Sequence, residues 1–408
     1  MNKIPFRQLL TTTVIVSALG YFVDIYDLIL FGIVRIPSLT EMGVTGNELI
    51  ETGVFLLNMQ MSGMLIGGII WGVWGDKRGR LSVLFGSIFL YSAANFANAF
   101  VTSTDMYAIL RFIAGVGLAG ELGAAVTLVS ETLPKELRGY GTAIVATVGV
   151  TGAIAAAIIG DIFPWQTAYI IGGVLGIVLL IMRIKMYESG MYKEIQKSSV
   201  SKGNFLKLFT SKDRFFRYLN CILIGLPIWF VVGTLITFSP EFAKVLNVQG
   251  PISAGQSIMF TYIGLIFGDF ASGFLSQAMK SRKKVVLIFQ LLTFVFILVY
   301  LFTTGLSVTM FYFICILLGI AIGYWAVFVT AASEQFGTNL RSTVTTTVPN
   351  FIRGSVVPIT LVFNYLREPL GLIYAALLVG TVTVIIGFIS LYHLEETFNK
   401  DLNFIENI

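Results

Sequence analysis

The segments ETLPKELRG (131–139) and EQFGTNLRS (334–342) share one pattern, a glutamate followed by five residues and then Leu-Arg. The two copies lie about half the length of the 408-residue chain apart, and Gly72 and Gly273 repeat at nearly the same offset. A repeat over this distance predicts a chain built from two similar halves.

Outward from these segments the chain is strongly apolar. Hydrophobic residues make up 56% and charged residues only 12%, and the mean hydropathy is +0.85. A soluble domain carries roughly 25% charged residues, so too few polar side chains are present here to cover a soluble surface. This composition excludes a soluble enzyme, a disordered chain and a disulfide scaffold, and it predicts a polytopic membrane protein.

Twelve apolar runs reach the length of about 20 residues that a membrane-spanning helix needs. They cover residues 10–36, 51–74, 81–100, 104–130, 138–160, 166–185, 217–243, 254–278, 284–304, 307–333, 340–364 and 370–392. One long polar break separates the sixth run from the seventh. We therefore expect an all-α polytopic membrane protein with twelve transmembrane helices in two pseudo-symmetric six-helix bundles, 1–190 and 217–408, joined by a cytoplasmic linker, 191–216. A substrate site would lie between the two halves near mid-membrane.

Basic residues indicate the orientation. Most of the 27 Lys and Arg residues fall in loops on one side of the expected membrane, and Arg35, Lys244 and Arg367 are the loop residues on the other side. Because cytoplasmic loops carry the excess of Lys and Arg, both termini are expected in the cytoplasm. The expected location is the inner (plasma) membrane of a bacterium.

Several chemistries find no support in the sequence. Cys221 and Cys315 stand alone in apolar runs and His393 is the only histidine, so no metal site is expected. The GxGxxG pattern at 115–120 lies inside an expected helix rather than after a strand, and no phosphate-binding GxxxxGK[ST] motif occurs. We expect no cofactor except a coupling proton, and no nucleic-acid partner. The sequence does not favour a membrane enzyme or a channel, because no nucleophile–base pair is evident and the repeat closes within one chain.

Six segments carry a family resemblance. They are DIYDLILFG (24–32), GVWGDKRGR (72–80), RFIAGVG (111–117), GLAGELGAAVTLVSE (117–131), MYESGMY (186–192) and LEETFNKDL (394–402). Together they resemble the major facilitator superfamily over essentially the whole chain, and within it the metabolite:proton symporter and sugar-porter groups. The glutamine pair that sugar porters carry on helix 7 is absent, which disfavours a hexose substrate.

Ionisable residues within spans are costly unless paired or hydrated, so they are candidates for function. Asp24 and Asp27 are three residues apart on the first helix and share a face. The resemblance implies that Asp27 pairs with Arg111 and carries the coupling proton. Asp24 and Glu121 align with acidic positions of the symporter group, and either could take this role instead. The alternative is a permanent ion pair that only holds helices together.

Arg353 is the expected anion-binding residue of the central cavity. Pro349 and Pro358 flank it, which predicts an interrupted helix with freed backbone groups. The alternative is a salt bridge to an acidic residue such as Asp269, for which function and structural pairing remain equally open. The other expected substrate-binding residues are Asn350, Tyr26 and Trp325.

Charged residues at the cytoplasmic helix ends form a further group. The resemblance implies that they tie the two bundles together when the inner side is closed, although basic loops also set the orientation. This expected cytoplasmic gate comprises Asp76, Arg80, Glu131, Arg138, Glu334 and Arg341.

The expected function follows from these features. We expect a secondary active transporter that moves a small polar metabolite, an organic anion or zwitterion, by proton-coupled symport with alternating access. Proton-driven efflux of an amphiphilic compound and uniport remain alternatives. The expected partners are the substrate and the lipid bilayer, and the protein is expected to act as a monomer.

Overall fold

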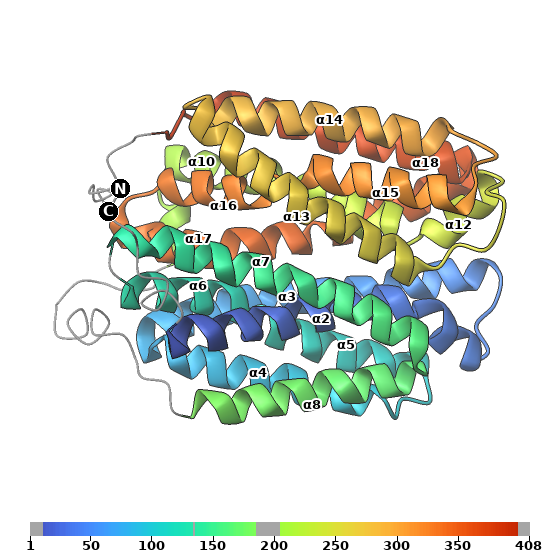
Figure 1. Cartoon of the computed structure of the whole chain (residues 1–408), viewed down its shortest axis with the longest axis horizontal. Coiled ribbons are helices and arrows are strands. Elements are labelled where there is room, and N and C mark those ends of the chain that lie inside the picture. The colour runs from blue at the N-terminus through green and yellow to red at the C-terminus, as the bar shows by residue number, and fades with distance from the viewer. Residues whose placement is uncertain (1–10, 134, 185–204, 399–408) are drawn as a thin grey trace.

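The computed structural model describes residues 11–133, 135–184 and 205–398, and the regular structure in these residues is helical (Figure 1). Helices α2 to α8 lie together on one side of the molecule and helices α10 to α18 on the other. The first group comprises α2 (Thr12–Glu41), α3 (Asn47–Arg78), α4 (Arg80–Asn98), α5 (Thr104–Leu118), α6 (Glu121–Thr132), α7 (Lys135–Ile162) and α8 (Trp165–Arg183).

The second group begins with the short 3-10 helix η1 (Phe205–Phe209). It continues with α10 (Lys212–Leu223), α11 (Leu226–Phe230), the π-helix η2 (Val231–Ile236), α12 (Ser239–Val245), α13 (Ala254–Ala278), α14 (Arg282–Phe302), α15 (Val308–Ile322), α16 (Trp325–Glu334), α17 (Thr338–Gly354) and α18 (Val356–His393). We call the two groups the N-bundle and the C-bundle. The expected linker, 191–216, lies partly outside the described residues, so the predicted bounds of the two halves stay a prediction. Its last residues, from Lys212 on, belong to α10.

The number of spans agrees with the sequence. Within the described residues, eleven helical segments are long and apolar enough to cross a membrane, and the last of them, Thr343–His393, is 51 residues long. Within it Gly371 has non-helical angles of φ 75° and ψ 167°, which L-residues with a Cβ rarely adopt. This glycine divides the segment into two spans, so the all-α polytopic fold is confirmed.

The chain runs back and forth along the long axis of the molecule, and α2 begins at the same end at which α18 ends (Figure 1). We call this end the terminal face and the other end the opposite face. Large apolar side chains such as Phe89, Phe274 and Leu361 are more than half exposed around the perimeter. A perimeter of this kind suits contact with lipid.

Several expected spans are interrupted where the two bundles meet or where glycines bring helices together. The span at 104–130 breaks between α5 and α6 at Ala119–Gly120, and the span at 340–364 breaks at Ser355. The latter break lies between Pro349 and Pro358, where the sequence predicted it. Such breaks free backbone carbonyl groups, which a membrane protein must satisfy internally.

Candidate functional site

A buried ion pair joins the two bundles, between α2 and the last turn of α17. Nη1 of Arg353 on α17 lies 3.8 Å from Oδ2 of Asp24 on α2, and the two side chains are 1% and 0% exposed. Arg353 therefore faces an acidic partner, but this partner is Asp24 and not Asp269. The sequence did not predict the pair, because the two residues are far apart in the chain and carry no shared motif.

The Asp24–Arg353 pair leaves much of its hydrogen-bonding capacity unused. A separation of 3.8 Å is too long for a hydrogen bond. Both carboxylate oxygens of Asp24, together with Nε and Nη1 of Arg353, are buried without a hydrogen-bond partner among the described residues, and so is Nε1 of Trp229. The Trp229 ring centroid lies 6.0 Å from the guanidinium carbon of Arg353. Because orphaned buried polar atoms are costly, this cluster is suited to a proton, water or a ligand.

Arg111 is held differently from the expectation. Its Nη2 donates to Oδ1 of Asn95 at 2.6 Å, and its guanidinium lies 4.9 Å from the ring centroid of Tyr169. Among the described side chains, no ion pair joins Arg111 to Asp27, whose two carboxylate oxygens are buried and unpartnered. Asn95 and Tyr169 thus contact the guanidinium, while its Nε and Nη1 are buried without a hydrogen-bond partner among the described residues. Asn95 carries no charge and so gave no signal in the sequence.

Glu121 forms a second buried pair, which we call the N-bundle ion pair. Arg183 donates to both carboxylate oxygens of Glu121, through Nη1 at 3.0 Å and through Nη2, and Nη1 also donates to the carbonyl of Leu84 at 2.9 Å. Both side chains are 0% exposed. Gly20 lies against this pair, because a Cβ there would overlap both partners. Arg183 is not among the site residues that the sequence predicts, because it stands at the end of an apolar run, beside the polar break.

Arg35 forms a third buried pair, towards the opposite face. Its Nη2 lies 2.5 Å from Oε1 of Glu241, and its guanidinium carbon lies 4.5 Å from the ring centroid of Phe238. Arg35 belongs to the N-bundle and both partners to the C-bundle. We call Arg35 and Glu241 the opposite-face ion pair. The sequence assigned Arg35 to a loop, whereas it is 0% exposed.

Two neutral contacts close the bundle interface on either side of Arg353. Nδ2 of Asn350 donates to the carbonyl of Ala119 at 2.9 Å, at the break between α5 and α6. Oγ1 of Thr360 donates to Oδ1 of Asn58 at 2.7 Å. Asn350 thus contacts the facing bundle, and the Asp24–Arg353 pair lies between closed contacts on both sides.

The remaining expected substrate residues have structural contacts. The Tyr26 hydroxyl donates to the carbonyl of Ala168 at 2.8 Å, within the N-bundle. Oδ1 of Asp269 accepts a hydrogen bond from the backbone N–H of Ala326 at 3.1 Å, in the first turn of α16. The ring of Trp325 lies beside that of Phe328. These contacts favour the structural alternative for Asp269.

Only part of the expected cytoplasmic gate can be located. Nη1 of Arg80 donates to the carbonyl of Gly75 at 2.8 Å, and Glu334 pairs with Arg282 at 3.4 Å. The gate function of these residues stays a prediction. The side chains of the other four, Asp76, Glu131, Arg138 and Arg341, lie outside the described residues.

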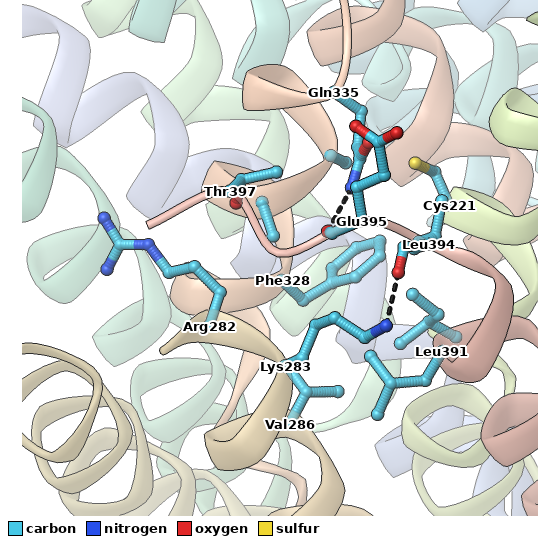
Figure 2. Close-up of a pocket in the computed structure, with 13 residues that line it drawn as sticks. Cys221, Arg282, Lys283, Val286, Phe328, Gln335, Leu391, Leu394, Glu395 and Thr397 are labelled. Carbon is cyan, nitrogen blue, oxygen red and sulfur yellow. Dashed lines mark hydrogen bonds between the residues drawn. The ribbon is translucent and has the colours of Figure 1, made fainter. Parts of the chain in front are cut away.

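The segment after α18 folds across the terminal ends of α14 and α16 (Figure 2). The side-chain amide of Gln335 donates to the Glu395 carbonyl at 2.8 Å, and Nζ of Lys283 donates to the carbonyl of Leu394. Burial would raise the pKa of the neighbouring Glu396, but hydrogen bonds from the Ser281 hydroxyl and from backbone N–H groups at the start of α14 outweigh it and lower that pKa. These hydrogen bonds therefore hold residues 394–398 against the C-bundle.

The geometry defines a membrane transporter of two helical bundles with a charged centre. Comparison with known proteins gives the family: residues 14–360 match the model of the Major Facilitator Superfamily, and the chain belongs to that superfamily. The chain is also similar to the putative niacin/nicotinamide transporter NiaP of Bacillus subtilis, at 25% identity over 90% of this chain and 87% of that one. It resembles the gentisate transporter of Corynebacterium glutamicum, at 24% identity over 78% and 73% of the two chains.

A solved structure agrees on the fold. The crystal structure of a D-xylose-proton symporter superposes with a TM-score of 0.74, over 96% of this chain and 99% of that chain, at 15% identity. At this identity the likeness concerns the fold alone. The protein is thus an integral membrane transporter of small metabolites, and the proteins it resembles are transporters and not enzymes.

Proposed function

We propose that this protein is a proton-coupled symporter that carries a small organic anion, with a carboxylate group, by alternating access. The observation that carries the proposal is the buried Asp24–Arg353 pair between the two bundles. We expect the terminal face to lie in the cytoplasm of a bacterial cell, with the protein acting as a monomer in the inner membrane.

A substrate carboxylate can replace Asp24 on Arg353. Arginine stays protonated in proteins and binds carboxylates through paired N–H groups, and here Nε and Nη1 have no hydrogen-bond partner among the described residues. Arg353 keeps a negatively charged partner during this exchange, because the substrate carboxylate takes the place of the Asp24 carboxylate. It also explains why a cation with no aqueous exposure is placed at the centre of the molecule.

Proton coupling follows from what the exchange does to Asp24. Once Arg353 binds the substrate, Asp24 remains as an unpaired carboxylate in a buried site, where the neutral, protonated form is favoured. The substrate and one proton therefore bind together. The net charge of the site is unchanged, because an anion and a proton enter as a pair.

The bundle interface supplies the alternating access. Arg353 belongs to the C-bundle and Asp24 to the N-bundle, so the ion pair holds the bundles together when the site is empty. When a substrate carboxylate replaces Asp24 on Arg353, the bundles lose this ion pair between them. The contacts Asn350–Ala119 and Asn58–Thr360, on either side of the pair, could then open one at a time.

The relatives support the substrate class. The Bacillus subtilis protein is named for niacin or nicotinamide and the Corynebacterium glutamicum protein for gentisate. Niacin and gentisate both carry a carboxylate group, which is the group that Arg353 would bind. They are therefore the first compounds to test.

Asp27 is the second candidate for the proton. Its two oxygens are buried without a partner, and the family resemblance implies this role for it. Asp24 is favoured because only Asp24 contacts the other bundle and competes directly for the anion-binding Arg353. Glu121 is a weaker candidate, because Arg183 binds both of its oxygens.

The test is uptake of radiolabelled niacin and gentisate into proteoliposomes with an imposed pH gradient. We expect accumulation when the outside is acidic, and we expect Arg353→Ala to weaken it more than Arg353→Lys. Flux that ignores the gradient would indicate a uniporter, and export towards the acidic side would indicate efflux. Equal, small effects of the two Arg353 variants would mean that the ion pair is only structural.

A further inference from the structure

We propose that Trp229 selects the body of the substrate, so that the preferred ligands are flat, conjugated carboxylates that carry a hydrogen-bond acceptor on the ring. This inference rests on the proposed function, since it assumes that Arg353 binds the carboxylate.

Trp229 and Arg353 lie side by side in the C-bundle. The ring centroid of Trp229 is 6.0 Å from the guanidinium carbon of Arg353. Trp229 is 5% exposed, and its Nε1 is buried without a hydrogen-bond partner among the described residues. An indole N–H in such a place usually finds an acceptor, so a bound molecule with an acceptor group would satisfy it.

The helices around this pair are packed closely on both sides. A Cβ at Gly225 would lie 2.7 Å from Cδ1 of Ile352, and a Cβ at Gly233 would lie 3.0 Å from Cγ1 of Val356. These two contacts bracket Trp229 along one segment and Arg353 along the other. Because both residues belong to closely packed segments of the C-bundle, we expect the ring and the guanidinium to keep this spacing when the bundles move relative to each other.

The local backbone also sets Trp229 apart. It lies on the five-residue helix α11, between a break at Gly225 and the π-helix Val231–Ile236. Irregular turns of this kind within a membrane span are tolerated where they are buried in protein or line a cavity, and π-helical turns are frequent at functional sites. Trp229 and Arg353 form the part of the site that belongs to the C-bundle, and Asp24, on the N-bundle, is the partner that the substrate displaces.

This arrangement can distinguish ligands by shape. A carboxylate bound to Arg353 places its adjoining atoms next to the Trp229 ring, where a flat conjugated ring can stack and a puckered saturated ring cannot. The indole N–H can also donate to a ring nitrogen or oxygen. Two separate properties of the ligand, flatness and an acceptor, should therefore change its affinity.

The experiment compares three probes by calorimetry on the full-length purified protein. Benzoate is flat and lacks a ring acceptor, cyclohexanecarboxylate has similar size and is puckered, and nicotinate is flat with a ring nitrogen. For the unchanged protein we expect benzoate to bind about 2- to 12-fold more tightly than cyclohexanecarboxylate, the range for one aromatic pair, and nicotinate to bind more tightly than benzoate.

Two variants separate the contributions of the ring and the N–H. Trp229→Leu should bring the benzoate to cyclohexanecarboxylate ratio close to one while both still bind through Arg353. Trp229→Phe should keep that ratio and remove the advantage of nicotinate. Trp74→Leu, which removes a tryptophan that is 45% exposed, is the control and should change neither ratio.

The outcomes separate this inference from the proposed function. If the unchanged protein binds carboxylates and accumulates them with the pH gradient, but Trp229→Leu leaves the ratio unchanged, only the role of Trp229 is overturned. If no carboxylate binds the unchanged protein, both proposals are overturned. If Trp229→Leu does not fold, the nicotinate to benzoate ratio in Trp229→Phe decides: loss of the difference supports the inference, and its retention overturns it.

Discussion

Replacing Asp24 with asparagine should uncouple anion binding from the proton. In the unchanged protein, a substrate carboxylate must displace Asp24 from Arg353, and a proton must neutralise Asp24. In Asp24→Asn the side chain has nearly the same volume and no charge. The anion should then bind without displacing a competitor and without a proton.

The size of the effect follows from the geometry of the pair. Two unit charges 3.8 Å apart attract each other by about 4 kcal/mol at an effective dielectric constant of about 20, which corresponds to about a thousandfold in affinity. This is the upper limit of the gain for an anion on Arg353, and we expect at least about tenfold. Without ligand the variant should be less stable, because leaving a buried partner uncompensated costs about 3–5 kcal/mol.

The assay is calorimetric binding of niacin, or of whichever carboxylate the uptake screen selects, across a pH range. When one proton binds with each anion, affinity falls by up to about tenfold for each pH unit above the range in which the carrier is already protonated. The unchanged protein should show this decline, and Asp24→Asn should bind equally well across the range. Bound anion should also raise the melting temperature more in the variant than in the unchanged protein.

Asp27→Asn is the matched comparison, since it removes a second buried carboxylate from the same helix face. If Asp24 carries the proton, Asp27→Asn keeps the pH dependence of binding. A flat response in Asp27→Asn together with an unchanged slope in Asp24→Asn would refute the reasoning and assign the proton to Asp27. In that case gradient-driven accumulation would be abolished by Asp27→Asn, while substrate exchange would survive in part.

Three further predictions concern the supporting contacts. Gly20→Ala places a methyl group against the N-bundle ion pair and should lower the free energy of unfolding by up to about 3–5 kcal/mol, which a lower melting temperature would report. In Gly273→Ala the added methyl group meets nothing within 4 Å, so the melting temperature should stay unchanged. Glu241→Gln weakens the opposite-face ion pair, so a cysteine at Thr237, now 5% exposed, should react faster with a polar maleimide in that variant. An unchanged rate would show that the ion pair does not help to close the opposite face. Because the pKa of Glu396 is lowered, its carboxylate should stabilise the docked segment 394–398 fully above about pH 4.5 and progressively less as the pH falls through the lowered pKa. The difference in melting temperature between the unchanged protein and Glu396→Gln should therefore shrink on acidification. A constant difference would contradict this.

The fold was predictable from the sequence because lipid imposes a simple rule. A span needs about 20 apolar residues, and polar loops must separate the spans, so composition along the chain suffices to count them. The interruption beside Arg353 was predictable as well, since the two prolines that flank it are visible in the chain. The interruption between α5 and α6 was not predicted, although Gly117 and Gly120 flank it, because glycines also suit close helix packing and tertiary contacts decide where the helix ends.

The site was only partly predictable, because side chains that meet across the bundles are distant in the chain. The intramembrane charges drew attention to Asp24 and Arg353 individually, but nothing in the sequence paired them. Arg183 and Arg35 stand near the ends of apolar runs. The position of an arginine in such a run does not show whether its side chain reaches the membrane surface or stays buried. Trp229 is one of many aromatics in a membrane bundle, and only its neighbour and its unpartnered N–H distinguish it.

The most direct measurement of the central claim is the number of protons that enter with each carboxylate. Proteoliposomes that contain a pH-sensitive dye and receive labelled substrate report both fluxes at once. Exchange of a substrate anion and a proton for the Asp24–Arg353 pair predicts one proton per carboxylate and no accumulation when only a membrane potential is imposed at equal pH. Carboxylate uptake without proton uptake, or accumulation driven by the potential alone, would contradict it.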